Sequence, residues 1–509
     1  MLQILPSSPY GSLYPAGPEG RRGPVLIPRS KQSLRSLFLW LCRFDCRRGG
    51  NYSSFVPNTR TRRDLLRIAG GSVALPRLTR ADSPAAEGEP WSTVPRILAR
   101  IRAPEFPARD FPITAYGAKG DGRTDSTAAI AHAIAECSRA GGGRVVVPRG
   151  VYSTAAIHLL SNVNLYVAPS ATLLFNQDPA RYLPLVATRF EGVELMNYSP
   201  LLYADGQENI AITGEGTLDG NADDAHWWPW KASAGSRKSL FDMGERGVPL
   251  AERRFGEGHS LRPTFIQPCR SRNVLIEGVT IVRSPMWEVA PYDCINVTIR
   301  NLKINSHGPN NDGCDPDSCR DVLIEGCTFD TGDDCIAIKS GRDRDGRRLA
   351  KPTENVIIRN CEMKDGHGGV TIGSEMSGGV RNVYVENCRL SSPRLNQALR
   401  FKTNALRGGT IENVYFRNIE VGEVSDAVLQ VDFYYDTGDK GSERPVVRNI
   451  QISNLTAKKA RYALFLKGFP NAHISDVRLD NCTISGVAQP NVVENVDGLT
   501  MDKVKINRL

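Results

Sequence analysis

The chain has 509 residues with 47 Gly, 32 Pro and 12 Cys, and 40% of its residues are hydrophobic, which excludes a disordered chain, a collagen-like repeat and a small disulfide scaffold. No stretch approaches the roughly 18 consecutive apolar residues of a membrane-spanning helix, so we expect no membrane span. The net charge of +9 is concentrated in residues 1–81, with 14 Lys and Arg against 3 Asp and Glu, whereas residues 82–509 have 50 against 52. A globally basic surface that would bind nucleic acid is therefore not expected.

The N-terminal part of the chain is basic and contains a motif of protein export. Residues 1–60 are rich in Pro, Ser, Gly and Arg, lack hydrophobic periodicity and are expected to form a disordered or non-natural extension. In residues 61–81, Arg62 and Arg63 precede a mildly apolar run, which resembles a twin-arginine export signal; a solvated basic tail is the alternative. With residues 82–109 as a linker, we expect a periplasmic or extracellular protein.

A short helix and a strand precede the repetitive part of the chain. Asp125 to Cys137 (DSTAAIAHAIAEC) combines polar capping residues with a small apolar face, and the strand Arg144 to Pro148 follows three glycines. Such a helix suits a lid over the open end of stacked strands, where core and sheet edges would otherwise be exposed. The glycines follow the helix instead of preceding it, so a phosphate-binding loop is not expected.

A nine-residue pattern recurs from residue 162 onward: Asn or Asp, an aliphatic, any residue, an apolar, any residue, Asn or Gly, an apolar or Cys, any residue, an apolar. The alternation of apolar and polar residues, broken at Asn or Gly, predicts two short strands joined by a turn. The copies start 23 to 36 residues apart, so insertions fall in loops. The clearest copies begin at Asn273, Asn296, Asp321, Asn355, Asn382, Asn413, Asn449 and Asp476.

These repeats predict an all-β fold for residues 110–509, a right-handed parallel β-helix with the short helix as its N-terminal cap. One repeat alone cannot bury its apolar face, whereas stacked repeats can. Strands stacked in this way form parallel sheets with neighbours ~4.8 Å apart. A β-propeller is the alternative, but its blades have more even periods of about 40–50 residues.

Four cysteines occupy the seventh position of the repeat, which aliphatic residues fill in other copies. This shared position predicts an inward-facing core ladder in preference to a metal site. Cys314 and Cys319 lie five residues apart in a loop and form a candidate disulfide pair. The ladder cysteines are Cys327, Cys361, Cys388 and Cys482.

Residues 307–402 concentrate charged and Gly-flanked polar residues that a structural repeat does not require. Asp333 and His367 each lie six residues after a ladder cysteine, so we expect them on adjacent rungs in one outward-facing column. Asp312 lies 21 residues before Asp333, which is close to one turn. Arg400 and Lys339 each lie twelve residues after a ladder cysteine, which predicts a basic column beside the acidic one.

Carboxylates gathered in one groove repel one another, so at least one should have a raised pKa and remain protonated near neutral pH. One protonated and one ionised carboxyl group are what glycosidic cleavage requires; separations of ~6.5–9.5 Å admit an attacking water, and ~5–5.5 Å imply a covalent intermediate. The basic column indicates a substrate that bears carboxylates. Asp-Asp after Gly also occurs in turns and calcium sites, and a His beside Gly is often structural, so the prediction depends on the whole ordered set.

From Phe111 to Leu509 the sequence resembles the polygalacturonase family of pectin-degrading glycoside hydrolases, family twenty-eight, in the pectate-lyase-like superfamily. Residues 116–130 (YGAKGDGRTDSTAAI) and 141–152 (GGGRVVVPRGVY) carry the superfamily part of the resemblance. Four motifs in order carry the specific part. They are Asn310-Asn311-Asp312 for the family's Asn-Thr-Asp, Gly332-Asp333-Asp334, Gly366-His367-Gly368, and Arg400-Phe401-Lys402 for Arg-Ile-Lys.

The resemblance implies hydrolysis of α-1,4 galacturonosidic bonds of pectin with inversion, without a metal or another cofactor. It implies that Asp333 is the general acid, that Asp312 and Asp334 activate the water, and that His367 supports the acid. The candidate substrate-binding residues are Arg400, Lys402, Asn310, Lys339, Tyr434 or Tyr435, and Trp287 as a sugar-stacking platform or a buried residue.

Several stretches resemble bacterial exo-acting members and favour exo action: residues 262–265 (RPTF), 284–287 (SPMW) and 339–341 (KSG). The loop from Gly341 to Thr353 would then close one end of the groove. The alternatives are a rhamnogalacturonan hydrolase, a pectate lyase that cleaves by β-elimination with calcium, and a non-catalytic carbohydrate-binding solenoid. In each case the expected partner is an acidic polysaccharide such as pectin or polygalacturonate, bound by a monomer.

Overall fold

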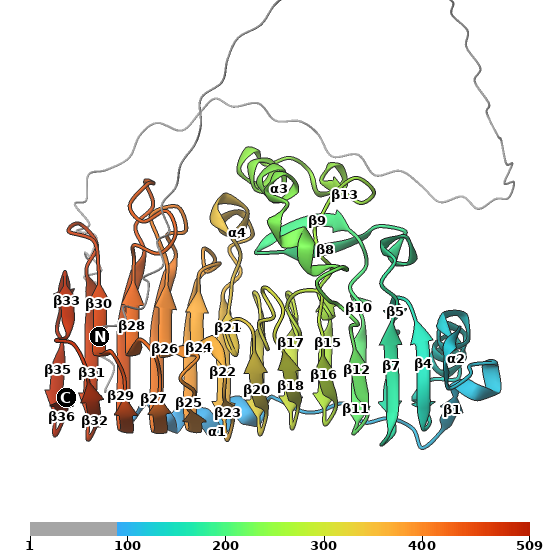
Figure 1. Ribbon diagram of the computed structural model, residues 1–509, viewed down its shortest axis with the longest axis horizontal. Helices are drawn as coiled ribbons and strands as arrows, with labels where there is room; N and C mark the ends of the chain where they lie inside the picture. The colour runs from blue at the N-terminus through green and yellow to red at the C-terminus, as the bar shows by residue number, and fades with distance from the viewer. Residues whose placement is uncertain (1–88) are drawn as a thin grey trace, which may run out of the picture. The chain divides into compact units, whose positions relative to one another are not determined.

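Parallel strands stack rung on rung through residues 89–509, the part of the chain that the computed structural model describes (Figure 1). One wall, here called sheet A, has 24 strands, and the opposite wall, sheet B, contains a 6-stranded sheet made of one strand per rung. The chain is therefore a right-handed parallel β-helix, as predicted, and the propeller alternative is wrong. Within residues 89–509 no helix is long and apolar enough to cross a membrane.

The nine-residue repeats lie in register in sheet A. Their second positions pair across rungs, for example Val274 with Val297 and Val297 with Val322, and these side chains are buried. Each repeat is a strand, a corner and a continuation, as the sequence predicted. The first strands of successive repeats are β15 (Arg272–Glu277), β17 (Ile295–Arg300), β19 (Arg320–Glu325), β22 (Thr353–Arg359), β25 (Val380–Leu390), β27 (Thr410–Glu423), β29 (Val446–Lys459) and β31 (Ile474–Asp480).

The Asn residues of the repeat mark backbone corners. Asn382 at position one and Asn387 at position six both have positive φ, of 58° and 55°, a conformation that Asn and Gly adopt with the least steric cost. The position-one amides also form a ladder. Asn382 Nδ2 donates to Asn355 Oδ1, and Asn382 Oδ1 accepts from Asn413 Nδ2, both at 3.2 Å. The pattern of Asn and Gly in the sequence is thus a pattern of turns.

The cysteines of the described residues are buried free thiols in the core. Cys388 pairs in register with Ile419, which confirms that Cys and aliphatic residues share one inward-facing position. Cys314 and Cys319 are both free, so the proposed disulfide between them is absent from this structure. Their neighbours on the stack, rather than a covalent bond, hold the loop.

The N-terminal end of the solenoid is covered by α2 (Thr127–Arg139), which buries Ile130, Ile134 and Cys137 against the first rungs (Figure 1). This helix and the following β3 (Gly143–Val147) match the predicted cap and strand within two residues. The strand β1 (Asp110–Pro112) is the first strand of sheet A along the chain.

Residues 89–109, the described part of the expected linker, lie along the outside of sheet A. Helix α1 (Val94–Leu98) buries Val94 and Ile97 against Tyr384 and Tyr415, and Arg100 forms an ion pair with Asp321. This segment is a packed strap and differs in that respect from a free linker. The export-signal motif of residues 61–81 lies outside the described residues.

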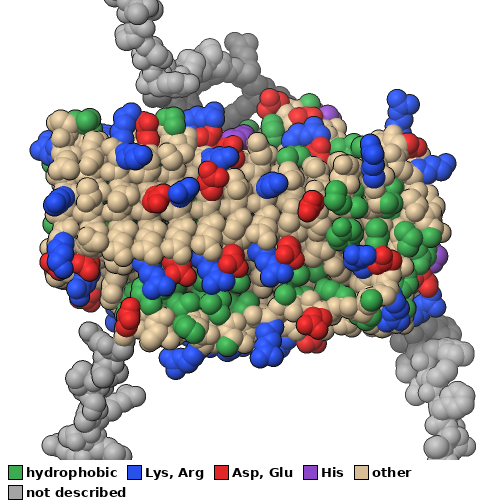
Figure 2. All heavy atoms as spheres, turned by 90° about the horizontal axis from the view of Figure 1, so that it is seen from below, with side chains coloured by type: hydrophobic (Ala, Val, Ile, Leu, Met, Phe, Trp, Pro, Cys, Tyr) green, Lys and Arg blue, Asp and Glu red, His purple; other side chains and the backbone are tan. Residues whose placement is uncertain are grey.

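Figure 2 shows the outer face of the solenoid from below. A band of uncharged polar side chains and backbone runs along the long axis, and Lys, Arg, Asp and Glu alternate on both sides of it. This face carries no extended patch of one charge, which agrees with the near balance of charges in residues 82–509.

Candidate active site

A cavity of about 680 Å³ lies over the middle rungs of sheet B. Its floor comes from the turns and strands around β21 (Ile336–Ile338), β24 (Gly366–Gly373) and β26 (Leu395–Lys402). Insertions in the rungs build a wall beside it (Figure 1). The wall consists of the antiparallel hairpin β8 (Val186–Phe190) and β9 (Val193–Asn197), helix α3 (Ala234–Arg246) and helix α4 (Asp343–Leu349).

The wall is attached through an apolar cluster of its own. Phe190, Leu195 and Leu240 pack with Met286 and Trp287, which belong to a rung of the solenoid. Helix α4 lies in the predicted loop from Gly341 to Thr353 and contacts both α3 and β9. Arg342, at the start of this loop, lines the cavity, so the loop borders the groove. Closure of one end of the groove by this loop stays a prediction.

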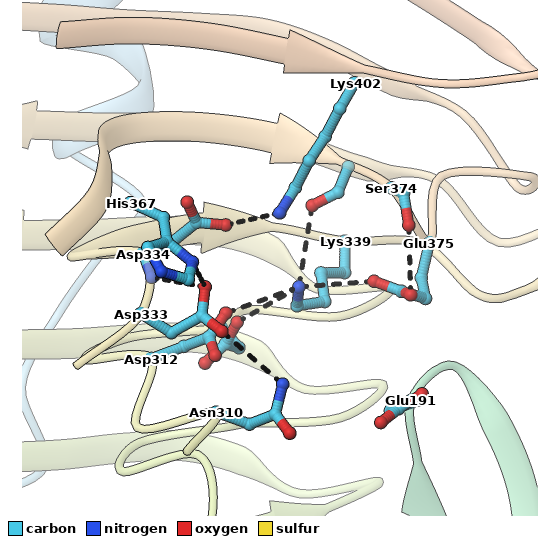
Figure 3. A network of polar contacts seen from close by, with 12 residues as sticks. Glu191, Asn310, Asp312, Asp333, Asp334, Lys339, His367, Ser374, Glu375 and Lys402 are labelled. Atoms are coloured by element: carbon cyan, nitrogen blue, oxygen red, sulfur yellow. Dashed lines mark hydrogen bonds and ion pairs between the residues drawn. The ribbon is translucent and has the colours of Figure 1, made fainter. Parts of the chain in front are cut away.

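The three carboxylates meet on the floor (Figure 3). Asp312 and Asp334 lie on successive rungs, since Cys314 pairs with Ile336 two residues later. Asp333 and His367 are also one rung apart, and Nδ1 of the imidazole lies 2.9 Å from Asp333 Oδ1. Both predictions of neighbouring rungs are therefore confirmed.

The charges of these groups are strongly coupled. Burial raises the pKa of Asp312 well above its usual value, and the negative charge of Asp333 adds to this effect. Burial would also raise the pKa of Asp333, but the hydrogen bond from His367 and the charge of Lys402 outweigh it, so the net shift is downward. The pKa of His367 is raised by the same hydrogen bond.

These shifts differ in direction among the three carboxyl groups. Asp312 is the one whose protonated form is favoured, whereas the hydrogen bond and the opposite charges of Asp333 and His367 favour a carboxylate next to an imidazolium. The prediction that one of the three carboxyl groups has a raised pKa is confirmed, but the raised pKa belongs to Asp312 and not to Asp333, the candidate acid.

Positive side chains flank the carboxylates. Lys402 Nζ lies 2.6 Å from Asp334 Oδ2, and Arg400 Nη1 lies 3.2 Å from Asp334 Oδ1. Burial would raise the pKa of Asp334, but these two cations lower it below its usual value. Asp334 is thus an ionised carboxylate held by two cations, and both cations also line the cavity.

The predicted basic column is wrong in its register. Lys339 directly follows β21 and lies in register with Gly373 of the next rung, which pairs with Lys402. Lys339 and Lys402 therefore share a column. Arg400 pairs with Thr371 and lies two residues away from that column. The turn between β25 and β26, residues 391–394, is two residues longer than the equivalent turn on the preceding rung, residues 364–365. Counting from the ladder cysteine therefore points to Arg400 where the structure has Lys402.

Lys339 is buried at the centre of an ionic network that sequence reasoning did not find. Its Nζ lies 3.3 Å from Glu375 Oε2, 3.4 Å from Asp315 Oδ1 and 3.8 Å from Asp312 Oδ2. Burial would lower the pKa of Lys339, but the negative charge of Glu375 and Asp315 raises it, so the ammonium group stays charged. Glu375 and Asp315 carried no signal beyond their position next to the motifs.

The asparagines of the first motif have different surroundings. Asn310 lines the cavity, and its Nδ2 lies 3.4 Å from Asp333 Oδ2. Asn311, which departs from the family motif, is fully buried and donates from Nδ2 to the carbonyls of Ser284 and Met286. The departure at Asn311 is therefore structural, because this amide fixes the turn that presents Asp312.

The aromatic candidates separate clearly in the structure. Tyr435 lines the cavity, with its ring centroid 5.3 Å from Lys402 Nζ and 5.6 Å from Arg400 Cζ. Tyr434 is one-third exposed and packs on Phe469 instead. Trp287 is 4% exposed, it lines the cavity, and Lys339 Nζ lies 4.5 Å from its ring centroid. The ring is largely buried and still borders the site, so its role as a stacking platform stays a prediction.

The three carboxylates each present an oxygen atom within 4.8 Å of the others, a spacing that can also hold a metal ion. The ammonium groups of Lys339 and Lys402 and the guanidinium group of Arg400 lie against the same carboxylates and supply positive charge there. The chemistry of this donor set is that of an acid, a base and cations for an anionic ligand.

Known proteins share this arrangement of sequence and fold. The family model "Glycosyl hydrolases family 28" matches residues 251–501, and the model "Rhamnogalacturonase A/epimerase, pectate lyase-like" matches residues 111–243. An exopolygalacturonase from Thermotoga maritima is 46% identical in sequence and superposes with a TM-score of 0.80, over 82% of this chain and 96% of that one. The chain belongs to family 28 of the glycosyl hydrolases. It is therefore an O-glycosyl hydrolase, as the ordered motifs predicted.

Other relatives of this family 28 hydrolase are more distant. An exo-poly-alpha-D-galacturonosidase of Dickeya chrysanthemi is 26% identical over 428 residues, which cover 76% of this chain and 69% of that protein. A probable polygalacturonase of Vitis vinifera is 28% identical over 406 residues, or 76% of this chain and 77% of that protein.

Proposed function

We propose that this family 28 hydrolase is an exo-acting polygalacturonase, which removes galacturonate units from one end of polygalacturonate. The proposal rests on a cluster of carboxylates flanked by cations in a cavity. On the side of the preceding rungs, this cavity is bounded by the wall. A polymer lying along sheet B would meet β8, β9 and α3 on that side, so a chain end fits the cavity better than the middle of a chain. The exo-acting relatives support the same reading.

The wall offers cations for the carboxylate of a terminal sugar. Within the described residues, Lys231 has no carboxylate within ion-pair distance, and the nearest carboxylate oxygen to Arg237 Nη1 is Glu191 Oε1 at 3.9 Å. Both line the cavity. In contrast, Lys238 is paired with Asp242 at 2.5 Å, and Arg342 with Glu375 at 3.2 Å. Arg237, with only its 3.9 Å contact to Glu191, is therefore the most weakly paired cation of the wall, whereas Lys231, which lies just before α3, donates to Asn310 Oδ1 at 2.5 Å.

In the proposed reaction, Asp333 protonates the leaving glycosidic oxygen. Because its pKa is low in the unliganded site, the proton comes from the imidazolium of His367, 2.9 Å away, and passes through the carboxyl group of Asp333. Asp334 is ionised and suits the role of base, together with Asp312 once substrate has changed its surroundings. Arg400, Lys402 and Tyr435 would hold the carboxylate and the ring of the sugar at the cleaved bond.

The proposed inversion of configuration rests on the family resemblance. One oxygen atom of each of the three carboxyl groups lies within 4.8 Å of the others. The ~6.5–9.5 Å of inverting enzymes and the ~5–5.5 Å of retaining enzymes separate whole carboxyl groups, so this spacing does not choose between inversion and retention. Following the anomeric protons of the first product by NMR distinguishes the two, since inversion gives the β-anomer from an α-linked substrate and retention gives the α-anomer.

The proposal is tested by incubating the purified chain with polygalacturonic acid while following reducing ends, absorbance of unsaturated products and product length. Monomer released with new reducing ends and without unsaturation is the expected result. Mixed oligomers would mean endo action. Unsaturated products that disappear with a chelator would mean a calcium-dependent lyase, and cleavage of rhamnogalacturonan alone would move the substrate to that polymer.

We also propose export to the periplasm or the cell exterior through the twin-arginine motif of residues 61–81, and action as a monomer. Pectin-type polymers lie outside the cytoplasm, which supports export of an enzyme that acts on them. Replacing Arg62 and Arg63 with Lys should retain the protein in the cytoplasm of the producing cell. Light scattering of the purified protein measures the oligomeric state.

A further inference from the structure

Asn310 connects the wall to the candidate acid. Its Oδ1 accepts a hydrogen bond from Arg262 Nη2 at 2.7 Å and another from Lys231 Nζ at 2.5 Å. Its Nδ2 lies 3.4 Å from Asp333 Oδ2. Figure 3 shows this amide below Asp333, pointing its nitrogen toward the carboxyl group.

The two cations fix which way the amide faces. An amide oxygen can accept from Arg262 and Lys231, whereas an amide nitrogen in its place would confront two positive donors. The NH2 group is therefore directed at Asp333. Oδ1 of Asp333 is already engaged by His367 and by the backbone N–H of Asp334, at 2.9 and 3.0 Å, so Oδ2 is the oxygen that Asn310 addresses.

Arg262 is placed behind the cavity and does not line it. Its side chain is buried, and its Nη1 also donates to the carbonyls of Pro285 and Pro309 at 3.0 and 2.5 Å. The residue thus joins two adjacent rungs to Asn310. Burial lowers the pKa of Arg262 to about 10, which still leaves the guanidinium group charged at neutral pH. The RPTF stretch, which resembles exo-acting family members, begins with this residue.

We propose that Arg262 is a positioning residue of the hydrolase, which acts with Lys231 through Asn310 to orient Oδ2 of Asp333 toward the leaving oxygen. The amide donor also favours the ionised form of Asp333, so the proton of the Asp333–His367 pair stays on the imidazole until substrate binds. This inference rests on the proposed role of Asp333 as the general acid.

The first test is Arg262→Lys, which keeps the charge but cannot reach Asn310 and both carbonyls at once. We expect kcat to fall about tenfold with KM changed less than about threefold, because an orienting contact is lost and no substrate contact is removed. The alkaline limb of the kcat–pH profile should move to higher pH, since a less stabilised Asp333 carboxylate holds the imidazolium proton more tightly.

A matched control separates orientation from stability. Arg253 is also a buried arginine of the inserted segment, bonded to the carbonyls of Val248 and Glu194 and to Asp345, and it has no bond to Asn310. Arg253→Lys should lower the Tm by a similar amount and leave the pH profile in place. If Arg262→Lys behaves in the same way, Arg262 is merely structural and the proposal is overturned.

A second variant tests the amide itself. Asn310→Asp keeps an oxygen for Arg262 and Lys231 but replaces the donor that faces Asp333 with a carboxylate oxygen. The alkaline limb should move further upward than in Arg262→Lys, because a negative charge next to the pair raises its affinity for the proton. An unchanged profile would contradict the proposed contact with Asp333.

A readout that does not depend on activity distinguishes this proposal from the proposed function. The imidazole of His367 is followed by NMR through a pH titration of the full chain, assigned with His367→Gln. Its pKa should rise in Arg262→Lys and in Asn310→Asp even if polygalacturonate is not the substrate. No change in either variant would overturn the inference, whereas a shift without hydrolysis would overturn only the proposed function.

Discussion

Sheet A and the floor of the cavity are built from the same rungs but follow opposite rules. In sheet A, Asn382 has an equivalent Asn on most rungs, and these like side chains bond to one another. On the floor of sheet B, successive rungs contribute different residues: Asp312, then Asp334, then Gly368. The repeated side chains of sheet A stabilise the stack, whereas the differing side chains on the floor form the candidate active site. Substitutions in the two regions should therefore have separable effects on activity and on folding.

The largest effect is expected for Asp333→Asn. Removing the group that delivers the proton should lower kcat by about 10³-fold or more. The protein should still fold into the same β-helix, because the side chain lies at the cavity and not in the core. Reducing-end assays measure kcat, and circular dichroism reports the fold, since the Tm also depends on the pair of Asp333 with His367. Retention of more than a few per cent of activity would exclude Asp333 as the general acid.

His367→Gln should lower kcat by about 10²-fold and remove the alkaline limb of the profile. In the wild type, activity should fall as pH rises through the raised pKa of His367, above its ordinary value of 6.5, because the imidazolium proton is lost. A profile of kcat against pH for both proteins is the measurement. A wild-type alkaline limb that persists in His367→Gln would assign that titration to another group.

The same pair makes stability depend on pH with two opposite signs. His367 has a pKa that is raised on folding, so its contribution to the free energy of unfolding is full below pH 6.5. That contribution is lost as pH rises through the raised pKa. Asp333 has a pKa that is lowered on folding, so its contribution to the free energy of unfolding is present above pH 3.8. That contribution is lost as pH falls through the lowered pKa. The difference in Tm between wild type and His367→Gln should thus be largest between these two ordinary pKa values, and a pH-independent difference would contradict the pair.

Arg400→Ala should weaken the binding of oligogalacturonate by about tenfold, measured by calorimetry in the inactive Asp333→Asn background. Arg389→Ala is a suitable control on the opposite wall, where Arg389 forms an exposed ion pair with Glu420. The control should bind as the parent does. Equal loss for a neutral oligosaccharide would deny Arg400 a role in carboxylate recognition.

The smallest effect on activity is expected in sheet A. Asn382→Gly keeps the positive φ but removes the ladder bonds, and Asn382→Ala also imposes the strain of a left-handed backbone, so Ala should destabilise by about 1 kcal/mol more than Gly. Denaturant unfolding measures the difference, and kcat should be unchanged in both. If Gly and Ala are equally destabilising, the amide ladder and not the backbone explains the choice of Asn.

The sequence was sufficient to predict the fold and the pairing of Asp333 with His367. Both depend on counting from a core position, and the segments from Cys327 to Asp333 and from Cys361 to His367 have equal lengths. The same counting failed for Arg400, because two additional residues in the turn at 391–394 shift the following strand. A repeat fixes its strands through burial, but its turns are free to vary in length.

Residues of the insertions could not be placed from the sequence. Lys231 and Arg262 lie 79 and 48 residues before Asn310, and only the packing of the wall brings them to it. The RPTF stretch indicates a resemblance to exo-acting family members but assigns no role to Arg262. The distribution of protons was also out of reach, because the pKa of Asp312 depends on burial and on charges from several rungs.

The buried thiols of the core have a consequence for where the chain can fold. The ten cysteines among residues 89–509 are unpaired and lie inside the stack, so its rigidity owes nothing to covalent cross-links. Such a chain can complete its folding in a reducing compartment, because no cross-link has to form there. Its stability comes from the stacking of one rung on the next.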